Sequence, residues 1–265
     1  MTAAALAGRV VLVTGVSRRA GIGVAIVERL LRDGAAVLAS GWEVHDTEMP
    51  WGADAGGSEA VIAAMAHADG RVAYLAADLE DAHAPQRLVR DAVEKFGRID
   101  VVVANHARSS GHCLAEVTAQ ELDRCWAVNA RASVLLAKSL AASREQGPGG
   151  RVILFTSGQH LQPMAGELAY AISKGAIQQM TATLADALID RGITVNCINP
   201  GPVDTGYAVG DAHARVARMF PTRRWGHPAD VARLVAWLAS DESAWITGQV
   251  INSEGGFRRW SAGES

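Results

Sequence analysis

Seven short runs of apolar, mostly β-branched residues recur along the chain and alternate with segments of helical periodicity. Most of these runs are continuously apolar, without the in-and-out alternation of a half-exposed strand, so both of their faces are expected to be buried. The runs are 9–14, 36–39, 71–75, 99–104, 151–156, 193–198 and 248–251. Strands of this kind, separated by helices, predict an α/β fold in which a doubly wound, parallel, seven-stranded sheet carries helices on both faces.

Helical segments fill the intervals between these strands. Apolar residues repeat every four positions from Ile22 to Leu30 and stop before Gly34, which predicts a helix directly after the first strand. Thr118 and Glu121 have the spacing of a capping box and mark the start of a long helix. Helices are expected over 57–68, 84–96, 119–144, 167–190 and 229–239.

Residues 42–57 and 201–227 form two long connections, and the second has room for one short helix. Long connections inside a compact domain are usually functional or mobile. No internal repeat, low-complexity tract or linker interrupts the 265 residues, so 1–265 are expected to form a single domain.

Composition excludes several classes of protein and site. Lys and Arg number 25 against 28 Asp and Glu, so the net charge of -3 lacks the basic excess of a nucleic-acid or anionic-membrane surface. The cysteines form no CxxC, and the histidines lack ligand spacing, which argues against disulfides and a bound metal. No apolar run reaches the roughly 18 residues of a membrane helix, and no secretory signal begins the chain. A cytoplasmic protein is expected, with no nucleic-acid or membrane partner.

A glycine-rich turn follows the first strand and opens the first helix. Glycines let the backbone approach a pyrophosphate, whose charge is stabilised by free N–H groups at the helix N-terminus. Tight turns use glycine for purely structural reasons too, but the strand-turn-helix context favours a dinucleotide site in a Rossmann sheet. The predicted contacts are Gly15, Ser17, Arg18, Arg19, Gly21, Ile22 and Gly23.

The end of the second strand discriminates between the two dinucleotides. NAD sites place a carboxylate there, whereas NADP sites place cations near the ribose 2′-phosphate. The strand ends on Gly41, which offers no carboxylate, while Arg18 and Arg19 could bind a 2′-phosphate. Glu43 could instead reach the ribose hydroxyls. NADP(H) is therefore favoured, with NAD(H) as the alternative.

Chemistry-bearing residues gather later in the chain. Tyr170 and Lys174 share one face of a predicted helix, where the ammonium would lower the phenol pKa and permit proton exchange near neutral pH. Ser157 directly follows the fifth strand, at the sheet edge where open α/β folds bind ligands. Asn129 lies inside a predicted helix although asparagine is a poor helix former, so it is either functional or a satisfied buried amide.

Together these motifs resemble those of the short-chain dehydrogenase/reductase family over nearly the whole chain. They are the glycine turn at 14–23, Asp78-Leu79, Asn105, Asn129, Ser157, Tyr170, Lys174 and the loop Pro200-Gly201-Pro-Val203-Asp-Thr205. The C-terminal residues 245–256 are similar to the end of 3-oxoacyl-acyl-carrier-protein reductases, which are the nearest subgroup.

The resemblance implies a role for each matching residue. Tyr170 would be the general acid for reduction or the base for oxidation, and Lys174 would lower its pKa and bind the nicotinamide ribose. Ser157 would hydrogen-bond the substrate oxygen, and Asn129 would hold a water that connects Lys174 to solvent. The remaining coenzyme contacts would come from residues that follow strands three, four and six. They are Asp78 and Leu79 at the adenine, Asn105 in the cleft, and Pro200, Gly201, Val203 and Thr205 at the carboxamide.

The expected activity is hydride transfer between NADP(H) and a ketone or secondary alcohol, as in a 3-oxoacyl-acyl-carrier-protein reductase. The substrate would be a small molecule or an acyl-carrier-bound carbonyl compound, and the resemblance also implies a homotetramer. The alternatives are an NAD-dependent alcohol or sugar dehydrogenase, a lyase or epimerase on the same scaffold, and a nucleotide-sensing binding protein.

Three departures from the family pattern affect these expectations. Five residues separate Gly15 from Gly21 where the family has three, so the phosphate contacts are open to change. His106 replaces the second asparagine of the family's motif and either packs beside the coenzyme or touches substrate. The insertion at 42–57 contains Trp42 and Trp51, which either cover the adenosine end or pack on the surface.

Overall fold

All seven predicted strands form, and they pair in parallel in one sheet within the described residues, 5–63, 65 and 70–260, of the computed structural model. Their order across the sheet is β3-β2-β1-β4-β5-β6-β7, which confirms the doubly wound topology. The strands are β1 (Val10–Thr14), β2 (Ala36–Gly41), β3 (Val72–Ala76), β4 (Val101–Ala104), β5 (Gly150–Phe155), β6 (Ile193–Asn199) and β7 (Val250–Asn252).

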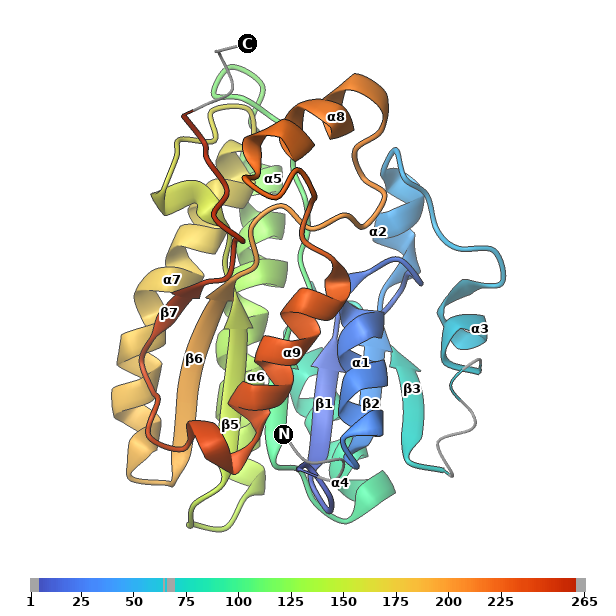
Figure 1. Cartoon of the computed structure of the whole chain (residues 1–265). Helices are drawn as coiled ribbons and strands as arrows, with labels where there is room; N and C mark the ends of the chain where they lie inside the picture. Colours follow the sequence, from blue (N-terminus) through green and yellow to red (C-terminus); the bar gives the residue numbers. More distant parts are fainter. Residues whose placement is uncertain (1–4, 64, 66–69, 261–265) are drawn as a thin grey trace.

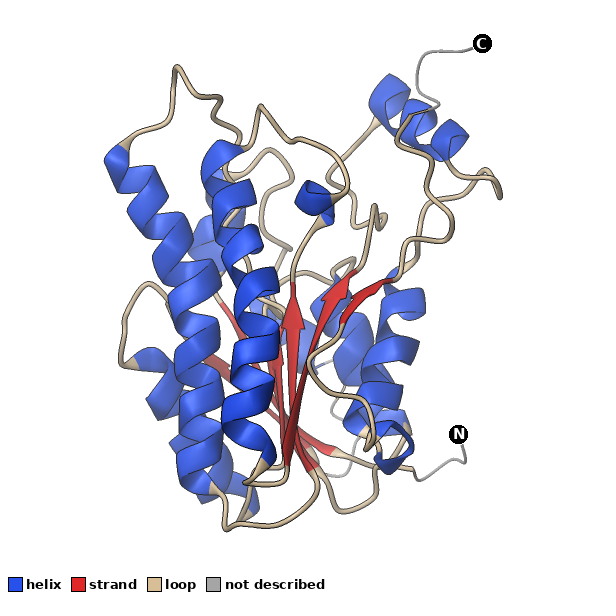
Figure 2. Ribbon diagram, turned by 90° about the vertical axis from the view of Figure 1, so that its left-hand side faces the viewer, coloured by secondary structure: helices blue, strands red, loops and turns tan. Residues whose placement is uncertain are grey.

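Helices cover both faces of this sheet (Figures 1 and 2). On one face lie α1 (Ile22–Arg32) and α9 (Pro228–Ala239), and on the other lie α4 (Ala84–Phe96), α6 (Ala132–Ser143) and α7 (Leu168–Ile189). Successive strand residues point to opposite faces, so the side chains of β1 contribute to two separate apolar cores. No helix in the described part of the chain is both long and apolar enough to span a membrane.

The chain reverses its order between β1 and β4. From β1 the sheet grows through β2 to β3 on one side and through β4 to β7 on the other. The loops that leave the carboxyl ends of β1 and β4 therefore diverge, and the space between them is where open α/β sheets bind ligands.

Several helical expectations need correction or refinement. The connection at 42–57 is not irregular throughout, since it contains the short helix α2 (Glu43–Glu48). The predicted long helix at 119–144 is divided into α5 (Ala119–Cys125), a π-helical turn (Trp126–Arg131) and α6. The helix expected over 57–68 is seen as α3 (Gly57–Ala63), while residues 64 and 66–68 lie outside the described residues.

Two other helical expectations are confirmed. The short helix expected within 201–227 is α8 (Gly210–Met219). The side chain of Thr118 accepts a hydrogen bond from the backbone N–H of Glu121 at 3.2 Å, as the capping-box spacing predicted.

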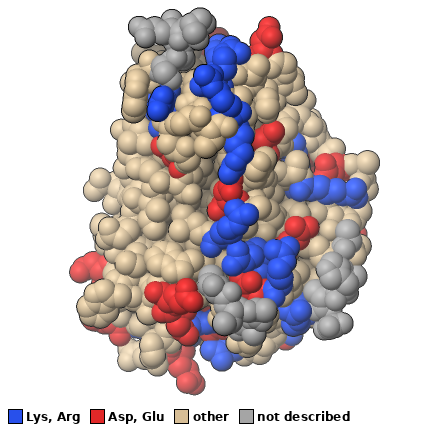
Figure 3. Space-filling view, in the orientation of Figure 1, with Lys and Arg blue, Asp and Glu red and all other residues tan. Residues whose placement is uncertain are grey.

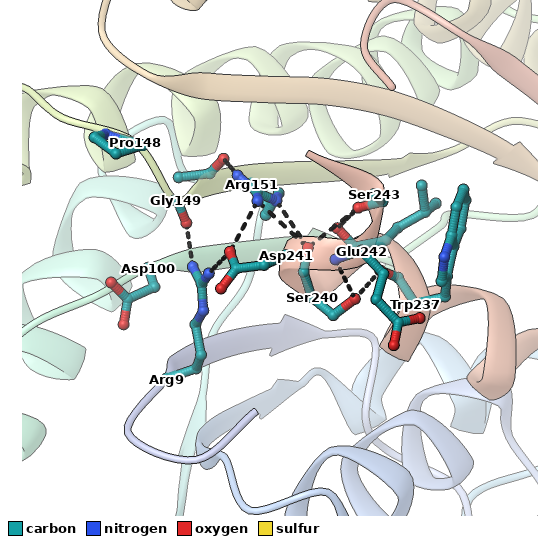
Figure 4. Close-up of polar contacts among 12 residues, drawn as sticks. Arg9, Asp100, Pro148, Gly149, Arg151, Trp237, Ser240, Asp241, Glu242 and Ser243 are labelled. Carbon is teal, nitrogen blue, oxygen red and sulfur yellow. Dashed lines mark hydrogen bonds and ion pairs between the residues drawn. The ribbon is translucent and has the colours of Figure 1, made fainter. Parts of the chain in front are cut away.

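Arginines join the elements at the amino edge of the sheet, opposite the ligand edge (Figure 4). The side chain of Arg151 is only 3% exposed and donates to the carbonyl oxygen of Ser240, just after α9. Asp241 accepts hydrogen bonds from both Arg151 and Arg9, and Arg9 also donates to the carbonyl oxygen of Gly149. This cluster holds β1, β5 and the end of α9 together, away from the loops that bind ligands.

Candidate active site

The glycine-rich turn between β1 and α1 borders a cavity of about 380 Å³ at the carboxyl edge of the sheet. A Cβ on Gly23 would lie 2.3 Å from the carbonyl oxygen of Gly15, so only glycine allows α1 to approach the turn this closely. Gly15 itself has a φ of 73°. The amide of Asn105, at the end of β4, donates to the carbonyl oxygens of Thr14 and Gly15 at 3.1 Å and fixes the turn.

The cavity collects most of the residues that were predicted to bind the coenzyme. Those in its lining are Gly15, Ser17, Arg18, Gly21, Ile22, Asp78, Leu79, Asn105 and Thr205. Those outside its lining are Arg19, Gly23, Tyr170, Lys174, Pro200, Gly201 and Val203. No side chain caps the N-terminus of α1, so its first N–H groups have no side-chain acceptor. A close-approach glycine turn and an uncapped helix N-terminus fit the diphosphate of a dinucleotide.

The two arginines of the turn lie in different environments. Arg18 donates from Nη2 to the carbonyl oxygen of Thr205 at 2.9 Å, and its guanidinium lies 5.6 Å from the ring centroid of Trp51. Arg19 is exposed, and its backbone N–H donates to the carboxylate of Asp54 at 2.5 Å. Of the two arginines of the turn only Arg18 lines the cavity, and the binding of a 2′-phosphate by both of them stays a prediction.

The carboxylate of Glu43 is engaged by α3 in this structure. Its carboxylate accepts a hydrogen bond from the backbone N–H of Ser58 at 2.5 Å, which holds its pKa below the ordinary range. Glu43 is also absent from the cavity lining. The one carboxylate that suggested NAD is thus engaged with α3.

Helix α2, which sequence reasoning missed, forms a wall of the cavity. Trp42, His45 and Glu48 line it, so one of the two tryptophans of the insertion does cover this site. His45 Nε2 accepts a hydrogen bond at 3.2 Å from the backbone N–H of Ser109, and Glu48 contacts Arg108 at 3.4 Å. Both partners lie in the loop after β4, so α2 bridges the cavity from β2 to β4.

Ser157, Tyr170 and Lys174 come together at the ends of β5 and α7. The Ser157 hydroxyl lies near enough to the Tyr170 phenol to act on the pKa of that phenol. Lys174 Nζ lies 5.6 Å from the centroid of the Tyr170 ring and donates to the carbonyl oxygen of Phe155 at 3.0 Å. A phenol, a hydroxyl and an ammonium, far apart in sequence, thus share one site.

The pKa values of these groups differ from the sequence-based expectation. Burial raises the pKa of Tyr170 to about 12, against the opposing effect of the nearby Ser157 hydroxyl, so the expectation of a lowered phenol pKa is wrong. Burial lowers the pKa of Lys174 to about 8. Near neutral pH the phenol therefore holds its proton, and most of the lysine is charged.

Asn129 is fully buried in the π-helical turn. Its Oδ1 accepts from the backbone N–H of Arg108 at 2.7 Å, and its Nδ2 donates to the carbonyl oxygen of that residue at 3.1 Å. Nδ2 also donates to Ser173 Oγ at 2.8 Å, and Ser173 in turn donates to the carbonyl oxygen of Tyr170 at 2.8 Å. The amide is a satisfied buried group that connects the loop after β4 to α7. The π turn that carries Asn129 is a feature that frequently occurs at functional sites.

His106 is a buried residue of the cavity lining. Its Nε2 lies 2.9 Å from the carbonyl oxygen of Val128, which can only accept, so Nε2 carries the proton. Its Nδ1 lies 2.7 Å from Thr14 Oγ1. Burial, together with the nearby charge of Lys174, lowers the pKa of His106 to about 3. His106 is thus a neutral packing residue in the cavity wall, which matches the first of its two alternatives.

A pH-dependent stability follows from this buried histidine. Its folded-state pKa of about 3 lies below the ordinary value of 6.5, so the stabilisation is complete above pH 6.5 and is lost as the pH falls toward 3. From pH 6.5 to pH 5 this group alone should remove about 2 kcal/mol from the free energy of unfolding. Denaturant titrations of His106→Asn and wild type should show a smaller loss in the variant. An equal loss in both would contradict a depressed pKa at this position.

The residues after β6 complete the description of the predicted site. Gly201 has a φ of 63°, and its N–H donates to Asn199 Oδ1 at 3.1 Å. Val203 is buried and pairs with Gly226 in an isolated parallel bridge. Within the described ranges no group of three or more His, Cys, Asp or Glu is placed to hold a metal ion.

Comparison with known proteins gives consistent matches along the chain. A family model described as enoyl-(acyl carrier protein) reductase matches residues 15–258. A solved short-chain dehydrogenase/reductase from Serratia marcescens is 34% identical with a TM-score of 0.82, covering 95% of this chain and 99% of its own. A blue fluorescent protein from a metagenomic library, solved with NADPH, is 32% identical with a TM-score of 0.83, covering 95% and 98%. LugOII, described as a promiscuous reductase that catalyses keto-reduction at C1 during lugdunomycin biosynthesis, is 35% identical with a TM-score of 0.81, covering 95% and 98%.

Proposed function

The chain belongs to the short-chain dehydrogenase/reductase family, and on that premise we propose that it reduces a ketone to a secondary alcohol with NADPH. The observation that carries the proposal is that the Ser157 hydroxyl, the Tyr170 phenol and the Lys174 ammonium share one site, with Lys174 Nζ 5.6 Å from the centroid of the phenol ring. Two hydroxyls at one site could both bind the same substrate oxygen. The same set could run the reverse oxidation, in which Tyr170 would act as a base.

The coenzyme would supply the hydride, and the residues of this chain would manage the oxygen and its proton. Ser157 would donate a hydrogen bond to the carbonyl oxygen and fix its position. Tyr170, protonated at neutral pH because its pKa is about 12, would donate the phenolic proton as negative charge develops on that oxygen. Lys174 would stabilise the resulting phenolate, because an ammonium favours a nearby anion. This division of roles suits reduction better than oxidation, since the phenol starts in its acid form.

The turn and its surroundings support NADPH over NADH. Gly41 offers no carboxylate at the end of β2, Glu43 is bound to α3, and Arg18 lines the cavity. Asp78 and Leu79 line the same cavity and would contact the adenine, with Asn105 between them and the nicotinamide end. Arg18 would have to exchange the carbonyl oxygen of Thr205 for a phosphate, which is a stronger, charge-assisted partner.

This coenzyme assignment can be tested with one arginine. Arg18→Gln is expected to lower kcat/KM with NADPH by about tenfold or more, because a charge-assisted phosphate contact is worth about 1.5–3 kcal/mol. The effect with NADH should be clearly smaller. Arg19→Gln, which changes an exposed residue outside the cavity, should alter the ratio of the two coenzymes much less. A wild-type enzyme that prefers NADH would show the assignment to be wrong.

The substrate is proposed to be a small carbonyl compound, and an acyl group on an acidic carrier protein is the second candidate. That candidate is favoured by a band of basic side chains on the face shown in Figure 3. Exposed arginines on and between α8 and α9 are Arg215, Arg218, Arg223, Arg224 and Arg233. Arg224 and Arg233 share the carboxylate of Asp230, so part of this charge is neutralised.

We also propose a homotetramer in the cytoplasm. Trp126, Val134 and Ile172 are exposed apolar side chains at the π turn, α6 and α7, and Trp245 is 97% exposed beyond α9. Exposed large apolar side chains on neighbouring elements are typical of subunit contacts. The cysteines of the chain are free thiols, which suits a reducing compartment.

A further inference from the structure

The chain after β7 returns to the ligand edge of the sheet, where Figure 1 shows it rising beside the loops that follow β5 and β6. Two contacts with the end of α8 anchor this C-terminal segment, residues 253–260. The backbone N–H of Arg258 donates to the carbonyl oxygen of Met219 at 2.9 Å, and the ring of Phe257 lies 4.9 Å from that of Phe220. The segment is therefore fixed at the same edge as Ser157.

Glu254 and Arg259 form an ion pair within this segment. Arg259 Nη1 lies 2.8 Å from Glu254 Oε2, and Nη2 contacts the second carboxylate oxygen, so the pair is bidentate. The side chain of Arg259 is 11% exposed, and that of Glu254 is 10% exposed. Buried ion pairs contribute little net stability because of desolvation, whereas bidentate geometry fixes orientation well. The position of the pair is thus more informative than its energy.

Arg259 lies directly against the residue that follows Ser157. A Cβ built on Gly158 would come within 2.4 Å of Arg259 Nη2, so the guanidinium occupies the space that any larger residue would need. Gly158 does not have a left-handed backbone, so the contact with Arg259 is the constraint on its size that the structure shows. The guanidinium therefore supports the backbone that carries the Ser157 hydroxyl.

Glu254 contacts the loop on the other side of the site. Its Oε1 accepts from Asn199 Nδ2 at 2.8 Å, and Asn199 Oδ1 accepts from the N–H of Gly201. A Cβ on Gly201 would lie 2.9 Å from Glu254 Cγ, so backbone and side chain are packed tightly there. This contact fixes the start of the loop that continues to Val203 and Thr205.

We propose that Glu254 and Arg259 are positioning residues that tie the loop after β5 to the loop after β6. The inference rests on the proposed function, in which Ser157 holds the substrate oxygen and the second loop holds the nicotinamide end of the coenzyme. The ion pair then sets the distance between the two reacting partners without touching either of them. A misplacement of about 1 Å is enough to lower a rate by about a hundredfold.

The two ends of the pair should give different kinetic signatures. Arg259→Met removes the guanidinium beside Gly158 and breaks the ion pair, but it leaves the hydrogen bond from Asn199 to Glu254 in place, so kcat should fall by about ten- to a hundredfold while the dissociation constant of NADPH stays near that of wild type. Glu254→Met also removes the acceptor of the Asn199 hydrogen bond, so it should lower kcat and also weaken NADPH binding in a fluorescence titration. Arg259→Lys keeps the charge but not the bidentate geometry, and should recover part of kcat.

Two further variants separate positioning from folding. Gly158→Ala removes neither charge but displaces the guanidinium, so it should reproduce the loss of kcat with little change in melting temperature. Arg90→Met breaks an ion pair of similar length, 2.8 Å to Asp91, at a side chain that is 59% exposed, and should leave kcat unchanged. Wild-type kcat in both Arg259→Met and Gly158→Ala would overturn the proposal, as would losses that simply follow melting temperature.

Failure of the proposed function would be visible separately. A wild-type protein that binds NADPH but reduces no carbonyl compound would refute the function alone. The NADPH titrations would still test whether the pair connects the two loops, because Glu254→Met should weaken binding and Arg259→Met should not. Equal NADPH affinities for wild type and Glu254→Met would contradict the proposal.

Discussion

Tyr170→Phe is expected to lower kcat for ketone reduction by about 10²–10⁴-fold, the usual contribution of a general acid. The substitution removes the proton donor and leaves the ring in its packing position beside Lys174. Since the phenol pKa of about 12 keeps the proton in place at neutral pH, the wild-type donor is fully available and its loss has the largest effect. Steady-state rates at saturating NADPH measure the change, and a fluorescence titration should show nearly unchanged coenzyme affinity.

A second tyrosine provides the matched control. Tyr207 is 48% exposed and packs edge-on against Trp225, with ring centroids 5.6 Å apart. Tyr207→Phe should therefore keep most of the wild-type kcat. Equal rates for wild type and Tyr170→Phe would exclude Tyr170 as the acid, and equal losses in both variants would point to packing.

The charge of Lys174 should have the second-largest effect on catalysis. Its loss should appear as a fall in the rate of reduction at alkaline pH. The lysine pKa of about 8 means that the ammonium is present below that pH and is lost as the pH rises through it. Tyr170 remains protonated throughout this range. The kcat/KM for reduction should therefore be flat near pH 7 and fall by about tenfold per pH unit well above pH 8.

Variants of Lys174 test whether the loss of its ammonium causes the fall in kcat/KM above pH 8. Lys174→Met should reduce kcat/KM at pH 7 by about a hundredfold and flatten the alkaline limb, because no ammonium remains to titrate. Lys174→Arg keeps a cation that does not titrate in this range, so it should move the limb to higher pH. A limb that remains at the same pH in both variants would belong to another group.

The fold was predictable because most of its strands are continuously apolar, as the fully buried β4 and β5 illustrate. Helix α2 was missed for a physical reason. Its only buried residue is Asp46, so it has no apolar periodicity, and its acidic first turn is the one local signal that favours a helix. The π turn at Asn129 was missed because one extra residue in a helix hardly disturbs a periodic pattern.

The site was predictable where short spacings and strand ends decide it. Ser157 and Tyr170 meet because one follows β5 and the other lies in the first turn of α7. The positions of Arg19 and Glu43 were not predictable, since Asp54 and Ser58 engage them through contacts that no local pattern reveals. The raised pKa of Tyr170 was also missed, because burial is a property of the assembled fold.

Transfer of deuterium from the nicotinamide tests the proposed chemistry most directly. NADPH labelled at C4 on one face would be incubated with the enzyme and a ketone that it accepts, and the alcohol product would be analysed by mass spectrometry and NMR. One deuterium at the carbinol carbon, with one NADPH oxidised for each alcohol formed, is the expected result. Turnover of a substrate without deuterium in the product and without net oxidation of NADPH would contradict hydride transfer and indicate a lyase or an epimerase.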